Sequence, residues 1–244
     1  MSILKKTGGL LWALYGAFWF MLFAISFTIA YAFILAVKGK DYSMKLVWVN
    51  YSFISPALLR LLLVKTRVHG REKIAPDKTY VFVANHTSQL DIILTASATP
   101  QPARFLAKME TKYIPFFGIM VRMLGIVVDR KSKESREQSY LHMAAALNKG
   151  ESLFLYPEGT RNRTEVPLKE FKDGAFKVAI MAQVPVAVQT IVGAKALNPV
   201  QGFQLYPGTV DIYWSNPIET KGMTLDDLPA LKERARQEML AHLS

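Results

Sequence analysis

Residues Asn85–Asp91 (NHTSQLD) follow a short apolar run, Thr79–Ala84 (TYVFVA). The run is rich in β-branched and aromatic side chains, which predicts a buried strand. The residues from about Leu90 to Ala98 are typical of a helix, so His86 lies in a loop that leads from a strand into a helix. In open α/β sheets, ligands bind at this edge. The stretch therefore predicts an α/β sheet and the position of its site.

His86 combines a strand-end position with a carboxylate five residues further on, at Asp91. A histidine can take a proton from a hydroxyl when a second group fixes its tautomer, and Asp91 is the candidate for that group. Five residues of one continuous helix would put two side chains about 140° apart, so the chain must turn between them. Ser88 and Asp91 fit the S/T-x-x-D/E pattern of a helix start, which predicts that turn. The same pattern leaves open that Asp91 is only a helix-start acid and His86 an ordinary loop histidine.

Composition restricts the classes of function. The 244 residues suffice for one large α/β domain with an appendage. The absence of cysteine excludes disulfides and thiolate metal sites, and no metal-ligand spacing is recognisable, so we expect no metal and no cofactor. A net charge of +11 favours an anionic membrane, a phosphorylated substrate, an acidic carrier protein or nucleic acid as partner. The 51% hydrophobic content favours a membrane over nucleic acid, for which no binding motif is recognised.

The N-terminal region predicts a membrane anchor. Residues 10–37 are almost unbroken apolar sequence, with no charge between Lys6 and Lys38, and a helix of this length can span a bilayer. A signal peptide is an alternative, but the apolar run is long for one. Residues 42–65 predict a second, interfacial helix interrupted at Pro56. Because basic residues flank the first run on both sides, a span, a helical hairpin in one leaflet and a buried soluble helix pair all stay open.

We expect anchoring helices in residues 1–65 and an α/β domain in residues 66–244. Sequence patterns predict strands near residues 66–70, 79–84, 105–108, 124–130, 152–156, 185–191 and 209–214, and helices near residues 90–98, 135–148, 171–183 and 225–243. Ser135 and Gln138 fit a capping box at the start of one helix. Alternation of strands and helices predicts a mixed, largely parallel sheet flanked by helices, preceded by a membrane-associated two-helix segment.

A second group of candidate residues follows another predicted strand. Pro157–Arg161 (PEGTR) comes directly after residues 152–156, so we expect it at the same sheet edge as His86. Gly159 allows a tight turn and close backbone approach. Arg161 has a planar fork that suits a phosphate or a carboxylate.

Three further charged residues are candidates for the same site. Glu158 can hold Arg161 or a substrate hydroxyl, or can be one half of a weak surface ion pair. Lys108 and Arg130 stand near the ends of other predicted strands and can join Arg161 around one anion. Each of these cations, taken singly, is also compatible with a solvated surface charge.

Together these residues resemble the motifs of the glycerolipid acyltransferase family. The H-x4-D motif at residues 86–91 is followed, in the order and approximate spacing of the family, by Lys108, residues 115–118 (PFFG), residues 156–161 (YPEGTR) and residues 184–186 (VPV). The resemblance covers about residues 66–217 and is strongest to bacterial members that acylate 1-acyl-glycerol 3-phosphate. Two departures from the family pattern, Tyr156 for the usual Phe and Met109 for the usual Lys or Arg, do not touch the chemistry.

The resemblance implies transfer of a fatty acyl group to the free 2-hydroxyl of lysophosphatidic acid, giving phosphatidic acid. The donor would be acyl-coenzyme A or acyl-acyl carrier protein as co-substrate, and the location a membrane, at the cytoplasmic face of a bacterial inner membrane. His86 would be the general base and Asp91 would hold it. The acceptor phosphate would be bound by Lys108, Arg130 and Arg161. The site would be shaped by Glu158, Gly159 and Thr160.

Three alternatives stay open. The same chemistry can act on another acceptor, such as glycerol 3-phosphate, a lysophospholipid or a lyso-aminolipid. A non-catalytic membrane lipid-binding protein is an alternative from another class, although binding alone does not need the His86–Asp91 pair. A hydrolase that releases the acyl group to water is the third.

Overall fold

The computed structural model describes residues 3–39, 42–129, 132–199 and 204–243. In this part of the chain seven strands form one sheet in the order β1-β7-β6-β2-β5-β3-β4. The strands are β1 Val64–His69, β2 Val81–Ala84, β3 Ala103–Lys108, β4 Ile126–Val128, β5 Ser152–Leu155, β6 Val186–Val192 and β7 Gly208–Trp214. Neighbouring strands are parallel except for β6 and β7. The predicted mixed, largely parallel sheet is therefore confirmed.

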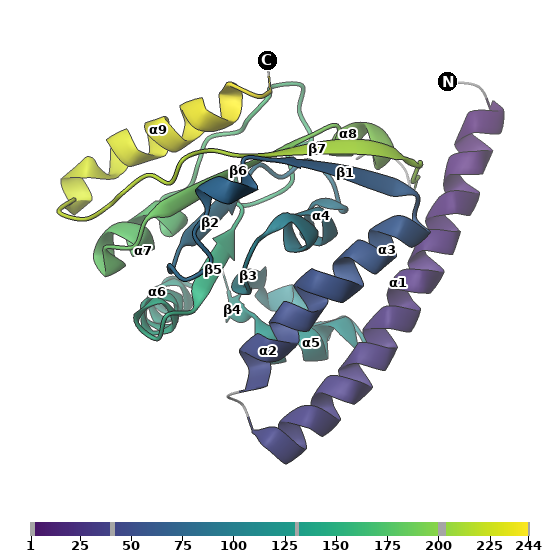
Figure 1. The fold of residues 1–244 in the computed structure, drawn as a ribbon, viewed down its shortest axis with the longest axis horizontal. Helices are drawn as coiled ribbons and strands as arrows, with labels where there is room; N and C mark the ends of the chain where they lie inside the picture. Colours follow the sequence, from purple (N-terminus) through teal and green to yellow (C-terminus); the bar gives the residue numbers. More distant parts are fainter. Residues whose placement is uncertain (1–2, 40–41, 130–131, 200–203, 244) are drawn as a thin grey trace.

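Helices cover both faces of the sheet. They are α1 Ile3–Lys38, α2 Ser43–Val49, α3 Ser55–Leu61, α4 Asp91–Ala98, α5 Phe117–Leu124, α6 Lys133–Asn148, α7 Gly174–Ala182, α8 Ala194–Leu197 and α9 Leu228–Leu240. Figure 1 shows α6, α7 and α9 on one side and α1 to α5 on the other. Along β2, Phe82 and Ala84 belong to the apolar layer on the α4 side, and Val81 and Val83 to the layer on the α7 side. This is the alternation that a strand imposes.

β2 lies in the middle of the sheet, parallel to both β5 and β6. All four of its residues are buried, which explains why the run before His86 is continuously apolar. From β2 the chain continues through α4 on one face, and from β5 it continues to α7 on the opposite face. Connections that leave neighbouring parallel strands to opposite faces open a crevice at the carboxyl ends of those strands. His86 and the PEGTR turn both lie at this crevice.

α1 lies against the rest of the molecule over most of its length (Figure 1). Near its start, the backbone oxygen of Gly9 accepts from the Leu205 N–H at 3.0 Å. Near its end, the Tyr31 hydroxyl donates to the Leu46 backbone oxygen at 2.8 Å. Its open face exposes large apolar side chains, including Leu11, Leu14, Phe18, Ile29, Phe33 and Val37. The predicted apolar helix is confirmed, and by length and composition it is able to cross a membrane.

The second hydrophobic segment is less regular than predicted. Instead of one helix over residues 42–65, α2 and α3 are joined by a π-helical turn, Asn50–Ile54, and Pro56 stands in the first turn of α3. The helical part ends at Leu61, because residues 64–69 pair with β7 as a strand. β1 therefore begins two residues before the predicted strand.

The predicted capping box of Ser135 and Gln138 is wrong. α6 begins at Lys133, and Ser132 is its N-cap, with a hydroxyl oxygen that accepts from the Ser135 N–H at 3.1 Å. The Ser135 hydroxyl instead accepts from the Asp129 N–H at 3.0 Å. Serine is a favoured N-cap residue at either position, and the contact of Ser135 with the end of the preceding strand decides between the two.

The helix predicted to begin at Phe171 begins three residues later, at Gly174. The backbone N–H of Lys172 donates to the Pro157 oxygen at 2.8 Å, which holds the segment before α7 against the PEGTR turn. Phe171 is buried in the α7 layer without being helical. This segment therefore packs against the PEGTR turn instead of extending the helix.

Candidate active site

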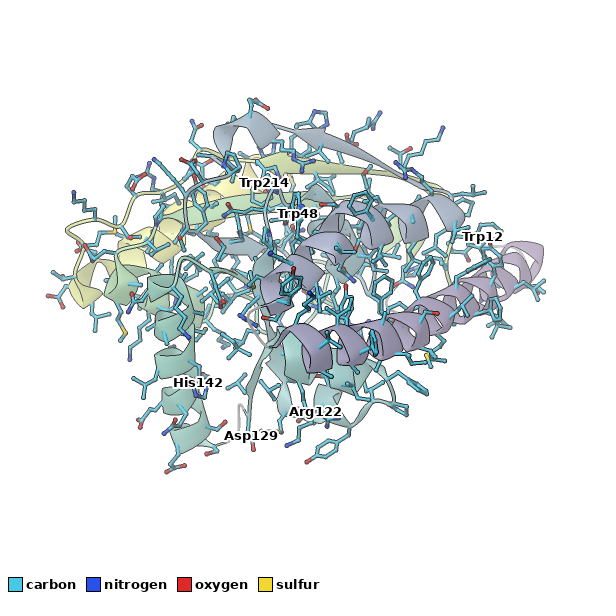
Figure 2. All side chains as sticks on the ribbon, turned by 60° about the horizontal axis from the view of Figure 1, so that its bottom comes forward. Trp12, Trp48, Arg122, Asp129, His142 and Trp214 are labelled. Atoms are coloured by element: carbon cyan, nitrogen blue, oxygen red, sulfur yellow. The ribbon has the colours of Figure 1, made fainter. Side chains whose placement is uncertain are left out.

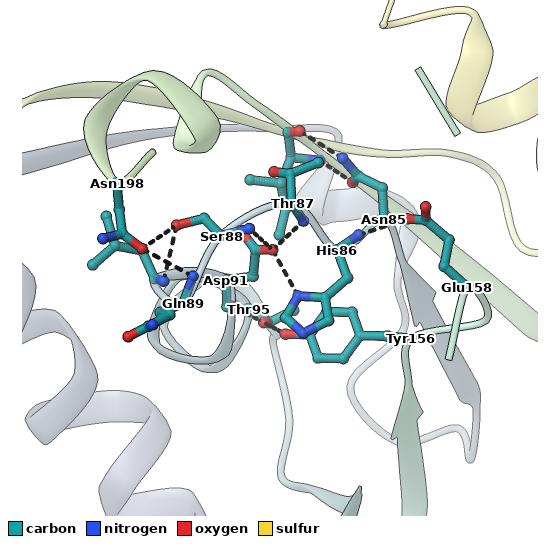
Figure 3. Close-up of polar contacts among 12 residues, drawn as sticks. Asn85, His86, Thr87, Ser88, Gln89, Asp91, Thr95, Tyr156, Glu158 and Asn198 are labelled. Atoms are coloured by element: carbon teal, nitrogen blue, oxygen red, sulfur yellow. Dashed lines mark hydrogen bonds and ion pairs between the residues drawn. The ribbon is translucent and has the colours of Figure 1, made fainter. Parts of the chain in front are cut away.

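The side chains of His86 and Asp91 meet because the chain between them turns around one carboxylate oxygen. Nδ1 of His86 lies 2.8 Å from Oδ2 of Asp91 (Figure 3). The same oxygen accepts from the backbone N–H groups of Thr87 at 2.7 Å and Ser88 at 2.8 Å. Asp91 is thus a helix-start acid and the partner of His86 at once, so the first role does not exclude the second.

The geometry determines which imidazole nitrogen carries the proton. A carboxylate only accepts hydrogen bonds, so Nδ1 of His86 is the donor and Nε2 is left as an acceptor. The Asp91 side chain is fully buried and that of His86 is 15% exposed. The second oxygen of Asp91, Oδ1, is buried without a hydrogen-bond partner among the residues that the structure describes. A histidine held in this way can act as a general base.

Tyr156, at the end of β5, fixes the plane of the imidazole. Its ring stacks on that of His86, with centroids 4.1 Å apart and planes 17° apart. Its hydroxyl lies 2.7 Å from that of Thr95, which in turn donates to the Asp91 backbone oxygen. Because a threonine hydroxyl has one hydrogen, Tyr156 is the donor in this chain of contacts. Burial and then the Asp91 carboxylate raise the pKa of Tyr156 well above its usual value, so the phenol stays protonated.

Glu158 connects the PEGTR turn to the backbone of His86 on the side of the turn away from the site. Oε1 accepts from the His86 N–H at 2.8 Å, and Oε2 accepts from the Lys169 N–H at 3.0 Å. The residue is 2% exposed, and burial raises the pKa of its carboxyl group against the opposing effect of these two bonds. Both oxygens are thus turned to backbone N–H groups and not to Arg161, one of the partners that the sequence suggested.

One cavity of about 780 Å³ connects the predicted residues. Its polar end is lined by His86, Lys108, Gly159, Thr160 and Arg161. Gly159 has φ +74°, a left-handed conformation that favours glycine and makes the tight turn after β5. Lys108 is exposed at the end of β3, whereas Arg161 is half-buried. The structure therefore brings the H-x4-D motif, the PEGTR turn and one further cation around the same space.

Of the predicted binding residues, Glu158 lies behind the turn and is not among those that line this cavity. Arg130 falls outside the described residues. Arg163, Thr164 and Lys169 line the cavity without having been predicted. Nζ of Lys169 lies 2.6 Å from the Thr160 hydroxyl oxygen. No local pattern marks Lys169 as a site residue, because its place depends on how residues 162–168 fold back.

Asn198, at the end of α8, is another residue that the sequence did not indicate. Its Oδ1 accepts from the Ser88 hydroxyl and from the Gln89 N–H, both at 3.1 Å. Asn198 thus supports the turn that carries His86 from a segment more than a hundred residues away.

Among the described residues, no group of three or more His, Asp or Glu side chains is placed to hold a metal ion.

The remainder of the cavity is apolar and extends to the N-terminal helices. Its walls include Phe20, Phe23, Ala24 and Phe27 of α1, Tyr51 and Ile54 of the π-helical turn, and Ile93 and Ala96 of α4. A pocket with a histidine and cations at one end and apolar walls along the rest fits a molecule with a polar head and a long hydrocarbon tail.

Comparison with known proteins agrees with this geometry. Residues 65–192, more than half of the chain, match the family model described as Acyltransferase. The chain belongs to the acyltransferase family. This acyltransferase is 35% identical over 181 residues to the protein named acl-2 of Caenorhabditis elegans. It is 30% identical over 193 residues to human 1-acyl-sn-glycerol-3-phosphate acyltransferase alpha.

These alignments cover 73% and 75% of the acyltransferase, and 64% and 68% of the worm and human proteins. The chain thus spans about two thirds of the length of these relatives. Among solved structures, the LPA acyltransferase PlsC from Thermotoga maritima superposes with a TM-score of 0.80 at 24% identity, covering 98% of this chain and 96% of that one. This likeness confirms the fold of the acyltransferase, N-terminal helices included.

Proposed function

We propose that this acyltransferase moves a fatty acyl group from an acyl thioester to the 2-hydroxyl of 1-acyl-glycerol 3-phosphate, giving phosphatidic acid. The observation that carries the proposal is the cavity that His86, held by Asp91, lines together with Lys108 and Arg161, while most of its remaining wall is apolar. The human relative, which is named as a 1-acyl-sn-glycerol-3-phosphate acyltransferase, supports the choice of acceptor.

The proposed chemistry needs one base and no protein nucleophile. Nε2 of His86 takes the proton of the acceptor hydroxyl while that oxygen attacks the carbonyl carbon of the thioester. The tetrahedral intermediate then collapses, the C–S bond breaks, and the leaving thiolate takes the proton back from His86. Asp91 stabilises the imidazolium that exists between the two proton transfers. A thioester is already activated, so a direct attack suffices.

We propose that the polar and the apolar parts of the cavity bind different parts of the substrates. We assign the acceptor phosphate to Lys108 and Arg161, because a guanidinium and an ammonium beside one space suit a phosphate. The acyl chains then occupy the apolar part that reaches Phe23 and Phe27 of α1. Acyl-coenzyme A and acyl-acyl carrier protein are the two donors that this reaction accepts, and both are acidic partners for a basic protein.

We place the enzyme on the cytoplasmic face of a bacterial inner membrane, with the open face of α1 in one leaflet. The contacts at Gly9 and Tyr31 hold α1 against the domain along its length. An α1 that crossed the bilayer in this arrangement would carry polar loops of the domain into hydrocarbon, at a cost of several kcal/mol for each unsatisfied backbone group. A helix that lies within one leaflet avoids that cost.

An acceptor panel tests the proposal. Purified enzyme in detergent is given radiolabelled oleoyl-coenzyme A with lysophosphatidic acid, glycerol 3-phosphate or lysophosphatidylcholine at equal concentration. We expect phosphatidic acid to be the main product, with little acylation of the other two acceptors. Preference for glycerol 3-phosphate or lysophosphatidylcholine would reassign the acceptor. Thiol release at the full rate without any acceptor would show a hydrolase, and acceptor binding without turnover from either thioester donor would show a lipid-binding protein.

A further inference from the structure

Residues 113–116 (YIPF) form an exposed apolar turn between β3 and α5. Tyr113 is 72% exposed, Ile114 47% and Phe116 37%, and Pro115 between them is exposed as well. A run of four exposed apolar residues is costly on a protein surface unless it meets a partner. We propose that this turn inserts into the headgroup layer of an anionic lipid leaflet, beside the substrate cavity.

The turn is held in its exposed position by the surrounding backbone. Phe116 has φ +59°, a conformation that L-residues rarely adopt and that here directs the chain into α5. Gly118 donates its N–H to the Ile114 oxygen at 2.7 Å, and a Cβ at Gly118 would lie 2.1 Å from the Lys112 oxygen. The Arg122 guanidinium donates to that same Lys112 oxygen at 3.1 Å. The apolar side chains are therefore presented by a defined loop.

The turn adjoins the helix that we place in the membrane. The hydroxyl of Thr28, in α1, donates to the Phe116 backbone oxygen at 3.1 Å. The open face of α1 displays Ile29, 64% exposed, one residue further along, and Phe33, 70% exposed, about one turn beyond it. A leaflet that receives this face of α1 therefore lies close to residues 113–116. The inference thus rests on the membrane placement of α1 in the proposed function and extends it to the α/β domain.

Charge around the turn matches an anionic surface. The charged residues of the segment 105–124 are Lys108, Glu110, Lys112 and Arg122. Three are basic and one is acidic, and Nζ of Lys112 lies 4.9 Å from the ring centroid of Tyr113. Basic groups at the edge of an inserted apolar turn gain from the negative potential of anionic lipids. This is the amphipathic arrangement of an interfacial membrane segment.

The position of the turn has a consequence for catalysis. Lys108 and Thr111, which precede it, and Val121, which follows it, line the substrate cavity. A leaflet in contact with residues 113–116 therefore lies beside the cavity that contains His86. The acceptor lipid enters sideways from the leaflet, so its acyl chain need not pass through water.

Depth measurements on single-cysteine variants test this inference, since the chain has no cysteine of its own. Ile114→Cys carries a nitroxide on the turn, Phe33→Cys one on the open face of α1, and Leu141→Cys one on α6, where the residue is 62% exposed. Figure 2 shows His142, the residue next to Leu141, on α6 and away from α1, whereas Arg122 lies close to α1. The full-length protein is bound to phosphatidylglycerol vesicles, and collisions of each label with oxygen and with a water-soluble nickel complex are compared.

We expect the labels at positions 33 and 114 to collide more with oxygen than with the nickel complex. The label at position 141 should collide more with the nickel complex. A label at position 114 that behaves like that at position 141, while position 33 is immersed, overturns the inference and leaves the proposed function intact. If positions 33 and 114 are both aqueous, the membrane placement of α1 is wrong and the inference falls with it.

A kinetic test uses the double variant Tyr113→Asp, Ile114→Asp, with Leu141→Asp as the matched control. Neither Tyr113 nor Ile114 lines the cavity, so acylation of lysophosphatidic acid dispersed in detergent should stay within about twofold of wild type. With the same acceptor embedded in phosphatidylglycerol vesicles, removal of two inserted side chains should lower the rate about tenfold or more. An equal rate on vesicles for the double variant, the control and wild type contradicts the inference.

Discussion

Replacement of Asp91 by asparagine separates the charge of the dyad from its geometry. Oδ2 of Asp91 accepts from Nδ1 of His86 and from the N–H groups of Thr87 and Ser88. An amide oxygen in that position accepts the same three bonds, whereas an amide NH2 there would oppose three donors. The amide nitrogen is therefore expected at the position of Oδ1, which has no hydrogen-bond partner in the described part of the chain. The histidine keeps its tautomer and orientation and loses only the negative charge beside it.

The lost charge determines the size of the effect. A contact of 2.8 Å puts the two charge centres roughly 4 Å apart, where two unit charges interact by about 4 kcal/mol at an effective dielectric constant of about 20. Part of the imidazolium charge has formed in the transition state, so we expect kcat to fall on the order of 10²- to 10³-fold. A buried NH2 group without a partner costs about 1–3 kcal/mol of stability, which relief from burying a charge offsets in part.

The assay is acyl transfer to lysophosphatidic acid, with kcat and KM determined separately for wild type, Asp91→Asn and Asp91→Ala. The loss for Asp91→Asn should lie in kcat, because the pair does not bind the acceptor phosphate. Asp91→Ala also removes the acceptor for the Thr87 and Ser88 N–H groups, so its Tm should be the lowest of the three. A folded Asp91→Asn with kcat within about threefold of wild type, or with its defect entirely in KM, would refute this account of the dyad.

Three further variants test the cavity and the turn beside it. Arg161→Ala should raise KM for lysophosphatidic acid about tenfold or more with a smaller change in kcat, and a folded variant with unchanged KM would remove Arg161 from the phosphate site. Glu158→Gln has one amide oxygen for the two N–H groups of His86 and Lys169, so urea denaturation should show a loss of about 1–3 kcal/mol. Because burial raises the pKa of Glu158, its ionisation disfavours the folded state. The difference in unfolding free energy between wild type and Glu158→Gln should therefore become smaller as pH rises above the ordinary carboxyl pKa. A difference that grows with pH contradicts this. Ala24→Phe fills part of the apolar region of the cavity and should shift donor preference toward shorter acyl chains, measured with a series of acyl-coenzyme A donors, whereas an unchanged chain-length profile would place the acyl chain elsewhere.

Local patterns were sufficient where local contacts decide the structure. The buried strand Val81–Ala84 follows from its continuous apolar run, and the turn between His86 and Asp91 follows from the helix-start pattern at Ser88. The PEGTR turn was predictable in the same way, because Pro157 and Gly159 follow the apolar run of β5 within four residues. Parallel strands then place these two stretches at one edge of the sheet without any further information.

Contacts between distant segments could not be predicted from these patterns. Glu158 holds the backbone of His86 across 72 residues, and Asn198 supports Ser88 across 110 residues. Each is a polar side chain in a loop, where sequence alone indicates solvent exposure as readily as burial. The backbone N–H of Lys169 donates to Glu158, and its ammonium donates to the Thr160 hydroxyl oxygen. This position depends on the fold of the whole loop.

The most direct test of the central claim is the synthesis of phosphatidic acid by wild type and by His86→Ala, with purified protein, radiolabelled oleoyl-coenzyme A and lysophosphatidic acid. The account predicts phosphatidic acid from wild type. For a folded His86→Ala it predicts a rate that is lower by about 10²-fold or more. Equal rates for the two proteins would contradict the assignment of His86 as the base. An inactive wild type, with acyl carrier protein also tried as donor, would contradict the proposed reaction itself.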